Sequence, residues 1–190
     1  MRTRDDKKQE ALFLATIKLV NEIGFAASSV SKIAKEADVS PATLYVYFKN
    51  KEDLLVSTYQ EIKLSMGIAL IEGLDEEQPI HDIFHLIWRN TFEYVVANQE
   101  EFRYAEQFSN SPFSELVDQP RLQENFKPIL RVIQKGIDQK IIKNVNLDVI
   151  LTFMFRPITA LANPSHCRIF EPSEENIETA FLMVWDALRL

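Results

Sequence analysis

The chain has 190 residues, of which 46% are hydrophobic and 26% charged, and a formal net charge of −7 at pH 7. This length and composition are ordinary for a soluble globular protein of one large domain or two small ones. A single cysteine excludes a framework of internal disulfides, and we expect a cytoplasmic protein, because the sequence has neither a secretory signal nor an apolar run of about 18 residues.

Only four glycines interrupt long stretches of helix-forming residues, which favours an all-α fold of about nine helices. The first helix is predicted over residues 6–23, because apolar residues recur at helical spacing and Gly24 is placed to end it. A second, short helix is predicted over residues 30–37, where either of two preceding serines can cap the first turn. Asp38-Val39 then forms a tight turn.

A third helix begins at the strongest start signal in the chain. Ser40 is a good N-terminal cap, and Pro41 suits the first helical position, where an N–H group is not needed. Leu44 and Phe48 are four residues apart, so they share a face that can pack on the second helix. The opposite face carries small side chains, a hydroxyl and two phenols, on Ala42, Thr43, Tyr45, Val46 and Tyr47.

Two helices joined by a short turn, with the second helix exposed, form a helix-turn-helix, whose second helix enters the major groove of DNA. Asn50 can cap a fourth helix that starts at Lys51, where the helix dipole and the ammonium would both attract a phosphate. Residues 1–55 hold nine Lys/Arg against eight Asp/Glu, so the basic bias is weak. DNA binding is therefore expected to depend on dimerisation and direct contacts.

The stretch from about Gln9 to Tyr59 resembles the DNA-binding domain of the tetracycline-repressor (TetR) family. Family members often have glycine before the valine of the turn, where this chain has Asp38, a residue that tolerates a left-handed backbone better than most. The matching pieces are Ala15, Gly24-Phe25, Ser29-Val30-x-x-Ile33-Ala34, Ala37-x-Val39-Ser40, Thr43-Leu44-Tyr45-x-Tyr47-Phe48 and Lys51-Glu52-x-Leu54.

This resemblance implies a three-helix helix-turn-helix DNA-binding domain at residues 1–50 and a helical effector-binding and dimerisation domain at residues 51–190. It also implies that two phenols bind phosphates while smaller residues of the third helix face bases; phosphate contacts position the helix, and base contacts specify the sequence. Arg2-Thr3-Arg4 forms either a disordered terminus or an arm toward the minor groove. The residues expected at the DNA are Ser29, Pro41, Ala42, Thr43, Tyr45, Val46, Tyr47, Lys49 and Lys51.

The remaining chain also reads as helical. Pro157 should kink or split the helix in which it lies. A short turn is expected over residues 114–117. The helices are predicted over residues 51–72, 80–98, 100–108, 120–139, 147–162 and 173–189.

Aromatic residues are frequent in this second part. Each is most simply a core residue, but together they are what an apolar ligand pocket between helices would need, and the TetR family usually has such a pocket. Arg89, Arg103 and Arg156 could supply a rim charge for an acidic ligand, or form salt bridges, or face solvent. The aromatic candidates for ligand binding are Trp88, Phe92, Tyr104, Phe108, Phe126 and Phe155.

The last two predicted helices carry apolar stripes with two interpretations. The stripes either close the core of the protomer or form part of a two-fold four-helix interface. The second interpretation follows from the resemblance and from the need of helix-turn-helix proteins for paired half-sites. The residues concerned are Ile150, Met154, Ile158, Ile177, Phe181, Val184 and Leu188.

Other chemistry is weakly indicated. His81 and His85 have the spacing of two zinc ligands on a helix, but no third ligand is near in sequence, so we expect no metal and no cofactor. No set of nucleophile and base appears, so we do not expect an enzyme. The sequence predicts a ligand-responsive transcriptional regulator, a repressor that binds a pseudo-palindromic operator as a homodimer and is released by a small apolar or amphipathic effector. The alternative is a helical protein-interaction module that no longer binds DNA.

Overall fold

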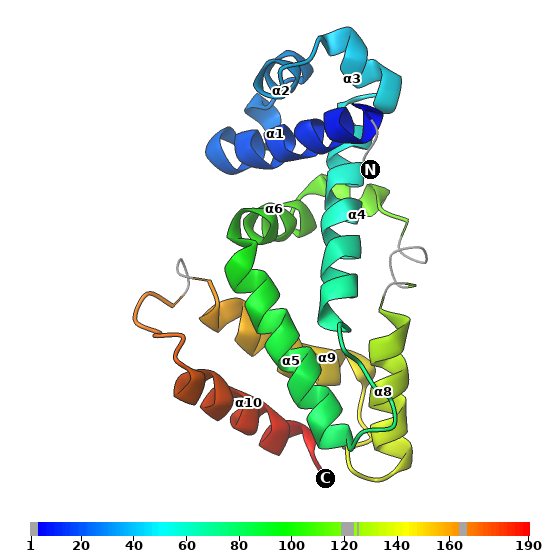
Figure 1. The fold of residues 1–190 in the computed structure, drawn as a ribbon, viewed down its shortest axis with the longest axis vertical. Helices are drawn as coiled ribbons and strands as arrows, with labels where there is room; N and C mark the ends of the chain where they lie inside the picture. The colour runs from blue at the N-terminus through cyan, green and yellow to red at the C-terminus, as the bar shows by residue number, and fades with distance from the viewer. Residues whose placement is uncertain (1–3, 119–123, 125, 164–166) are drawn as a thin grey trace. The chain divides into compact units, whose positions relative to one another are not determined.

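The computed structural model describes residues 4–118, 124, 126–163 and 167–190, and in this part nine α-helices and one 3₁₀-helix form (Figure 1). The predicted all-α fold is confirmed. The helices group into two compact units, one made of Met1–Lys63 and Glu100–Leu122, the other of Leu64–Gln99 and Gln123–Leu190. Among the described helices, none combines the length and apolar character needed to cross a bilayer.

The first unit begins with α1 (Arg4–Ala27), which is interrupted at Gly24. Gly24 has φ 76° and ψ 168°, a conformation that L side chains rarely adopt, so the helical run breaks at the predicted residue. The helix α2 (Val30–Glu36) starts at Ser29, whose hydroxyl accepts a hydrogen bond from the N–H of Lys32. Asp38 has φ 54°, a left-handed conformation that aspartate tolerates better than most residues.

The helix α3 (Pro41–Tyr47) starts as its sequence predicts. The hydroxyl of Ser40 caps it by accepting a hydrogen bond from the N–H of Thr43 at 3.1 Å. Leu44 and the C-terminal cap Phe48 hold the inner side of the helix in a core shared with α1, α2 and the start of α4. The buried members of this core are Leu12, Ala15, Ile33, Ala34, Leu44, Phe48 and Leu54.

The side chain of Asn50 caps the helix α4 (Lys51–Leu70) by accepting from the N–H of Asp53, and the carboxylate of Asp53 in turn accepts from the N–H of Lys49. The first unit is completed by most of α6 (Gln99–Ser109) and by the 3₁₀-helix η1 (Pro112–Leu116). Their second core contains Ile17, Val20, Leu55, Ile62, Tyr104, Phe108 and Val117. This packing places the described residues 100–118, which hold most of α6 and all of η1, in the same compact unit as the N-terminal helices. The division into domains of residues 1–50 and 51–190 stays a prediction.

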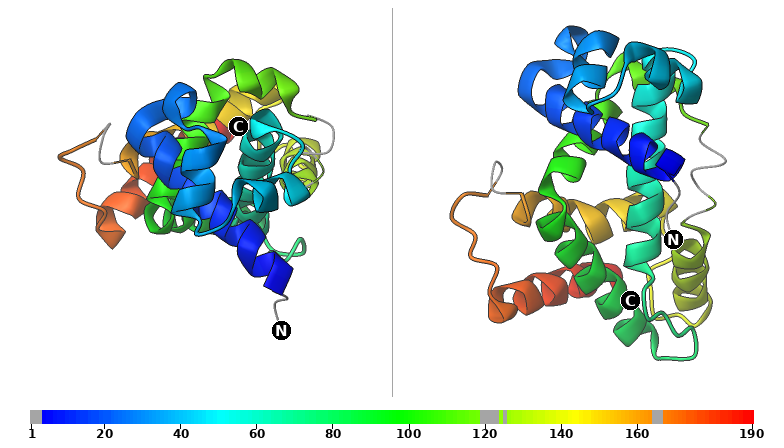
Figure 2. Two further views of the ribbon diagram at one scale, coloured as in Figure 1. Left: turned by 90° about the horizontal axis from the view of Figure 1, so that it is seen from above. Right: turned by 45° about the horizontal axis from the view of Figure 1, so that its top comes forward.

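The second unit contains α5 (Ile80–Ala97), α8 (Lys127–Asp138), α9 (Leu147–Leu161) and α10 (Glu174–Leu188). Both α9 and α10 pack against α5 and against each other, and Figures 1 and 2 show α9 and α10 side by side. The structure describes α9 as one helix that continues through Pro157. Of the helix predicted over residues 120–139, residues 120–123 and 125 lie outside the described part.

Candidate nucleic-acid interface

The outward face of α3 consists of side chains that the core leaves uncovered. Leu44 is fully buried, whereas Tyr45 is 56% and Val46 is 78% exposed. Pro41 and Ala42 are exposed at the start of the same helix. Since α3 has only seven residues, its orientation depends on its buried side, and the side chains of Tyr45 and Val46 face solvent.

Tyr47 is anchored more firmly than its neighbours. Its ring is half-buried against the first core and lies 6.4 Å from the ring of Phe48, centroid to centroid. Its phenol donates a hydrogen bond to a carboxylate oxygen of Asp5 at 3.0 Å. Burial raises the pKa of Tyr47, and the hydrogen bond to Asp5 raises that pKa further, so the phenol carries its proton at neutral pH. The sequence analysis missed Asp5, which lies 42 residues away in the chain.

The remaining candidates differ in how freely they face solvent. The Thr43 hydroxyl shares a hydrogen bond of 3.0 Å with the hydroxyl of Ser40, and the Ser29 hydroxyl caps α2. Lys49 is exposed. The ammonium of Lys51 is part-buried and donates to the carbonyl of Phe25 at 2.5 Å, so Lys51 ties the start of α4 to the segment after the α1 break.

Residues 12–58 match the family described as "Bacterial regulatory proteins, tetR family", and residues 79–189 match the "Tetracyclin repressor-like, C-terminal domain". The chain belongs to the TetR family. It is therefore a DNA-binding transcriptional regulator, and the regulatory character of the family confirms that it is not an enzyme.

Relatives support this membership along the whole chain. A TetR family transcription regulator from Marinobacter aquaeolei VT8 has a crystal structure that is 36% identical, with a TM-score of 0.91 over 100% of this chain and 99% of that one. An "Uncharacterized HTH-type transcriptional regulator" of Haemophilus influenzae is 25% identical over all of both chains. The "Fatty acid metabolism regulator protein" of Bacillus subtilis is 46% identical over 63 residues, which are 33% of this chain and 30% of that protein.

The six aromatic candidates of this TetR regulator are divided between the two units. Tyr104 and Phe108 are fully buried in the first unit, where Phe108 stacks on Tyr59 with ring centroids 4.4 Å apart. The other four belong to the second unit: Trp88 and Phe92 are buried in α5, whereas Phe126 and Phe155 are half-buried.

Tyr104 and its neighbours join α6 to the helices of the DNA-binding part. The phenol of Tyr104 donates to the carbonyl of Leu55 at 2.8 Å, and burial raises the pKa of Tyr104 well above its ordinary value. The amide of Asn21 in α1 donates to the carbonyl of Glu100 at 2.8 Å and accepts from Gln107 at 2.9 Å. These contacts make α6 part of the first unit.

Trp88 carries a buried indole N–H for which the described residues supply no partner. Its side chain is 1% exposed and stacks on Phe92 at 5.8 Å between ring centroids, with Phe181 at 6.0 Å. Among the described residues, no acceptor lies within hydrogen-bonding distance of its indole N–H. Because leaving a buried donor unpaired costs free energy, this N–H calls for an acceptor, which an ordered water or a bound molecule can supply.

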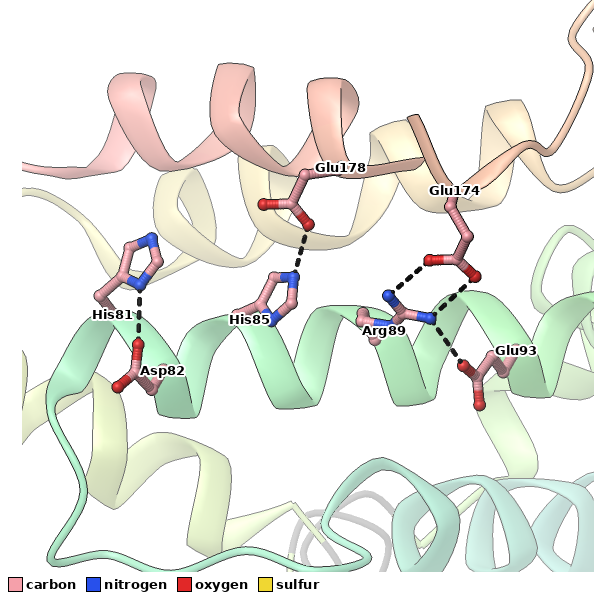
Figure 3. Close-up of polar contacts among 7 residues, drawn as sticks. All are labelled: His81, Asp82, His85, Arg89, Glu93, Glu174 and Glu178. Carbon is pink, nitrogen blue, oxygen red and sulfur yellow. Dashed lines mark hydrogen bonds and ion pairs between the residues drawn. The ribbon is translucent and has the colours of Figure 1, made fainter. Parts of the chain in front are cut away.

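Two side chains of α5, Arg89 and His85, contact carboxylates of α10, whereas His81 contacts Asp82 of its own helix (Figure 3). Arg89 forms two hydrogen bonds to Glu174, at 2.7 Å and 3.1 Å, and a weaker ion pair with Glu93 at 3.5 Å. His85 lies 2.7 Å from Glu178 of α10, and His81 lies 3.0 Å from Asp82. Within the described residues no group of three potential ligands is placed to hold a metal.

The other two arginines that were considered for a ligand pocket, Arg103 and Arg156, are exposed. Arg103 forms an ion pair with Glu100 at 3.7 Å, and Arg156 is exposed on α9.

The apolar stripes of α9 and α10 face inward. Ile150, Met154 and Ile158 of α9 are buried, as are three residues of α10, and Ile177 is half-buried. Of the two interpretations, the structure therefore favours the closed protomer core for these residues, because their side chains leave almost no surface for a second chain. The three buried residues of α10 are Phe181, Val184 and Leu188.

The opposite faces of these helices carry apolar side chains that the sequence analysis did not select. Val149 and Phe153 are exposed on α9, Phe153 by 51%, and Leu182 and Met183 are exposed on α10, Met183 by 70%. Val149 and Phe153 are four residues apart on α9, which is helical spacing, but the buried stripe of the same helix has more apolar residues at that spacing.

Proposed function

We propose that this TetR regulator is a repressor that binds a pseudo-palindromic operator as a homodimer and leaves it when a small apolar or amphipathic effector binds. The observation that carries the DNA-binding mode is the outward face of α3, which is held rigidly by its buried side and exposes small and hydroxyl-bearing side chains. In this mode Pro41, Ala42, Thr43 and Val46 face base edges, and Tyr45, Tyr47 and Lys49 contact phosphates. Its site of action is the cytoplasm.

Two of the expected contacts take a supporting role in this proposal. Ser29 caps α2 with its hydroxyl, and the ammonium of Lys51 is engaged by a carbonyl of its own unit. The Ser29 hydroxyl holds the first turn of α2 and the Lys51 ammonium holds the start of α4, so both residues contribute to DNA binding mainly by holding the scaffold.

The dimer is proposed to form through the outward faces of α9 and α10. Val149 and Phe153 lie on one helix and Leu182 and Met183 on the other, and the two helices pack side by side. A two-fold axis that pairs these faces makes a four-helix arrangement in which each exposed apolar side chain meets apolar surface. Two α3 helices are then available for the two half-sites of one operator.

The effector is proposed to bind in the second unit near Trp88. The unpaired indole N–H there supports a ligand with an oxygen acceptor on an apolar body, and Phe92 supplies an aromatic wall. Such a ligand releases DNA only if it binds the DNA-free conformation more tightly than the DNA-bound one.

Selection of bound sequences from a random DNA pool tests the operator proposal. The wild-type protein should enrich a two-fold symmetric site, and Tyr45→Ala should enrich it weakly or not at all. Ile169→Ala is a matched control, since it removes an apolar side chain that is 97% exposed in the second unit. No enrichment by a folded dimer at low salt would contradict the proposal and favour the interaction module.

The effector proposal is tested by tryptophan fluorescence. In Trp185→Phe, Trp88 is the remaining tryptophan, because the chain has two. Titration with decanoate or decanol, each an apolar chain with an oxygen acceptor, should change the Trp88 emission and lower operator binding in parallel. Decane saturating the buffer is the control without an acceptor. If neither amphiphile changes the Trp88 emission or the operator binding, the proposed ligand class is wrong.

A further inference from the structure

In its hydrogen bond to Asp5, Tyr47 donates the same hydroxyl proton that it would donate to a DNA phosphate. A phenol has one O–H and can donate only one strong hydrogen bond at a time. In this structure Tyr47 donates to a carboxylate oxygen of Asp5 at 3.0 Å. A phosphate oxygen that accepts the same proton must displace the carboxylate.

The ring of Tyr47 is held by the first core, whereas the carboxylate of Asp5 is exposed. The ring of Tyr47 packs on the first core, so its hydroxyl stays near the start of α1. Asp5 is exposed in the first turn of α1, where its charge complements the helix dipole whether or not it accepts from Tyr47. Asp6 is its neighbour in the same turn and contributes a second negative charge near the phenol.

We propose that Asp5 competes with DNA for Tyr47: its carboxylate occupies the hydroxyl of Tyr47 until a DNA phosphate displaces it. This inference rests on the proposed role of α3 in operator binding. Two anions cannot share the one phenol proton, and they repel each other at the separation that sharing would require. Asp5 therefore lowers the affinity for DNA and makes the Tyr47 contact conditional on a close fit of the phosphate.

The contact in the free protein is tested first. Asp5→Ala should lower the pKa of Tyr47 in an ultraviolet titration of the phenols, with Tyr47→Phe identifying which phenol moves. The raised pKa of Tyr47 has the Asp5 hydrogen bond as one of its causes. An unchanged Tyr47 titration in Asp5→Ala would overturn the inference without reference to DNA.

The competition is tested by a double-mutant cycle on the selected operator. Asp5→Ala should tighten binding by roughly threefold to tenfold more than Asp6→Ala, which removes an equal charge from the same turn. This excess should persist at high salt, where the charge effect common to both variants is screened. In a Tyr47→Phe background, Asp5→Ala and Asp6→Ala should become equivalent.

Equal effects of Asp5→Ala and Asp6→Ala in the wild-type background, or an Asp5→Ala excess that survives in Tyr47→Phe, would overturn the competition. A wild-type protein that enriches no DNA site overturns the proposed function itself and removes the competition with it. The failure of the competition and the failure of the proposed function are distinguishable. The competition can only fail with an operator that the protein binds, whereas the proposed function fails if the protein binds no operator.

Discussion

The outward faces of α3 and of the α9–α10 pair are both exposed, but they are built from different side chains. On α3 the exposed residues are Pro41, Ala42, Tyr45 and Val46, and the half-buried Thr43 adds a hydroxyl. On α9 and α10 the exposed set includes the larger apolar side chains of Val149, Phe153 and Met183. Groups of the first kind hydrogen-bond to phosphates and base edges, and groups of the second kind gain free energy only when another apolar surface covers them. The comparison shows that exposure alone does not define a partner; the chemistry of the exposed atoms does.

The largest expected effect comes from the inner side of α3. Leu44→Ala removes a fully buried side chain from the first core and should lower the free energy of unfolding by about 2–5 kcal/mol. Urea unfolding followed by circular dichroism measures this change. Val46→Ala, on the exposed side of the same helix, should change stability by less than about 0.5 kcal/mol. Equal losses in the two variants would contradict the assignment of the inner and outer sides.

The apolar face of α9 and α10 is tested by a charge. Met183→Glu places a carboxylate in the proposed dimer interface and should weaken dimerisation by about tenfold to a hundredfold, because a buried charge without a partner is costly. Sedimentation equilibrium measures the dissociation constant. Ile169→Glu adds the same charge at another highly exposed apolar position and should leave the dimer intact. A dimer that tolerates Met183→Glu would place the interface elsewhere.

Single substitutions on the DNA-facing side of α3 should change the free energy of operator binding by less than the two preceding predictions. Tyr45→Phe removes only the phenol oxygen from an exposed side chain and should weaken operator binding by about 0.5–1.5 kcal/mol, uniformly across related operator sequences. Val46→Ala should instead change which base is preferred at one position. Fluorescence anisotropy with a panel of single-base operator variants separates the two outcomes. A uniform loss in Val46→Ala would argue against its contact with a base.

The ion pairs between α5 and α10 should give the smallest effect, because all are near the surface. The guanidinium of Arg89 lowers the pKa of Glu174 below its ordinary value. A carboxylate with a lowered pKa stabilises the folded state above its unfolded pKa, and this contribution disappears as the pH falls through the folded value. Glu174→Gln should therefore flatten the acid side of the stability profile below roughly pH 4.5 and change little near pH 7.

The melting temperature of Glu174→Gln, recorded from pH 7 to pH 3, measures this dependence. Glu175→Gln removes the same charge from the neighbouring position of α10 and serves as its control. Parallel acid profiles for the two variants would indicate that Arg89 does not select Glu174 in solution.

Local signals in the sequence predicted much of the fold and part of the site. Ser40 and Asn50 cap the helices that follow them, and Gly24 breaks α1, because each acts on backbone groups within a few residues. The exposed face of α3 was predictable for the same reason: the spacing of Leu44 and Phe48 defines the buried side within one helix.

The sequence by itself determined the helices, the helix-turn-helix and the TetR resemblance. Only the tertiary structure decided that Tyr104 packs with the first unit, that Phe153 rather than Met154 faces outward, and that Asp5 meets Tyr47. Helical periodicity states which residues share a face, but α9 carries apolar residues on both faces, so periodicity cannot state which face is covered. Likewise, a contact across 42 residues depends on the path of the chain between its partners, which no local pattern encodes.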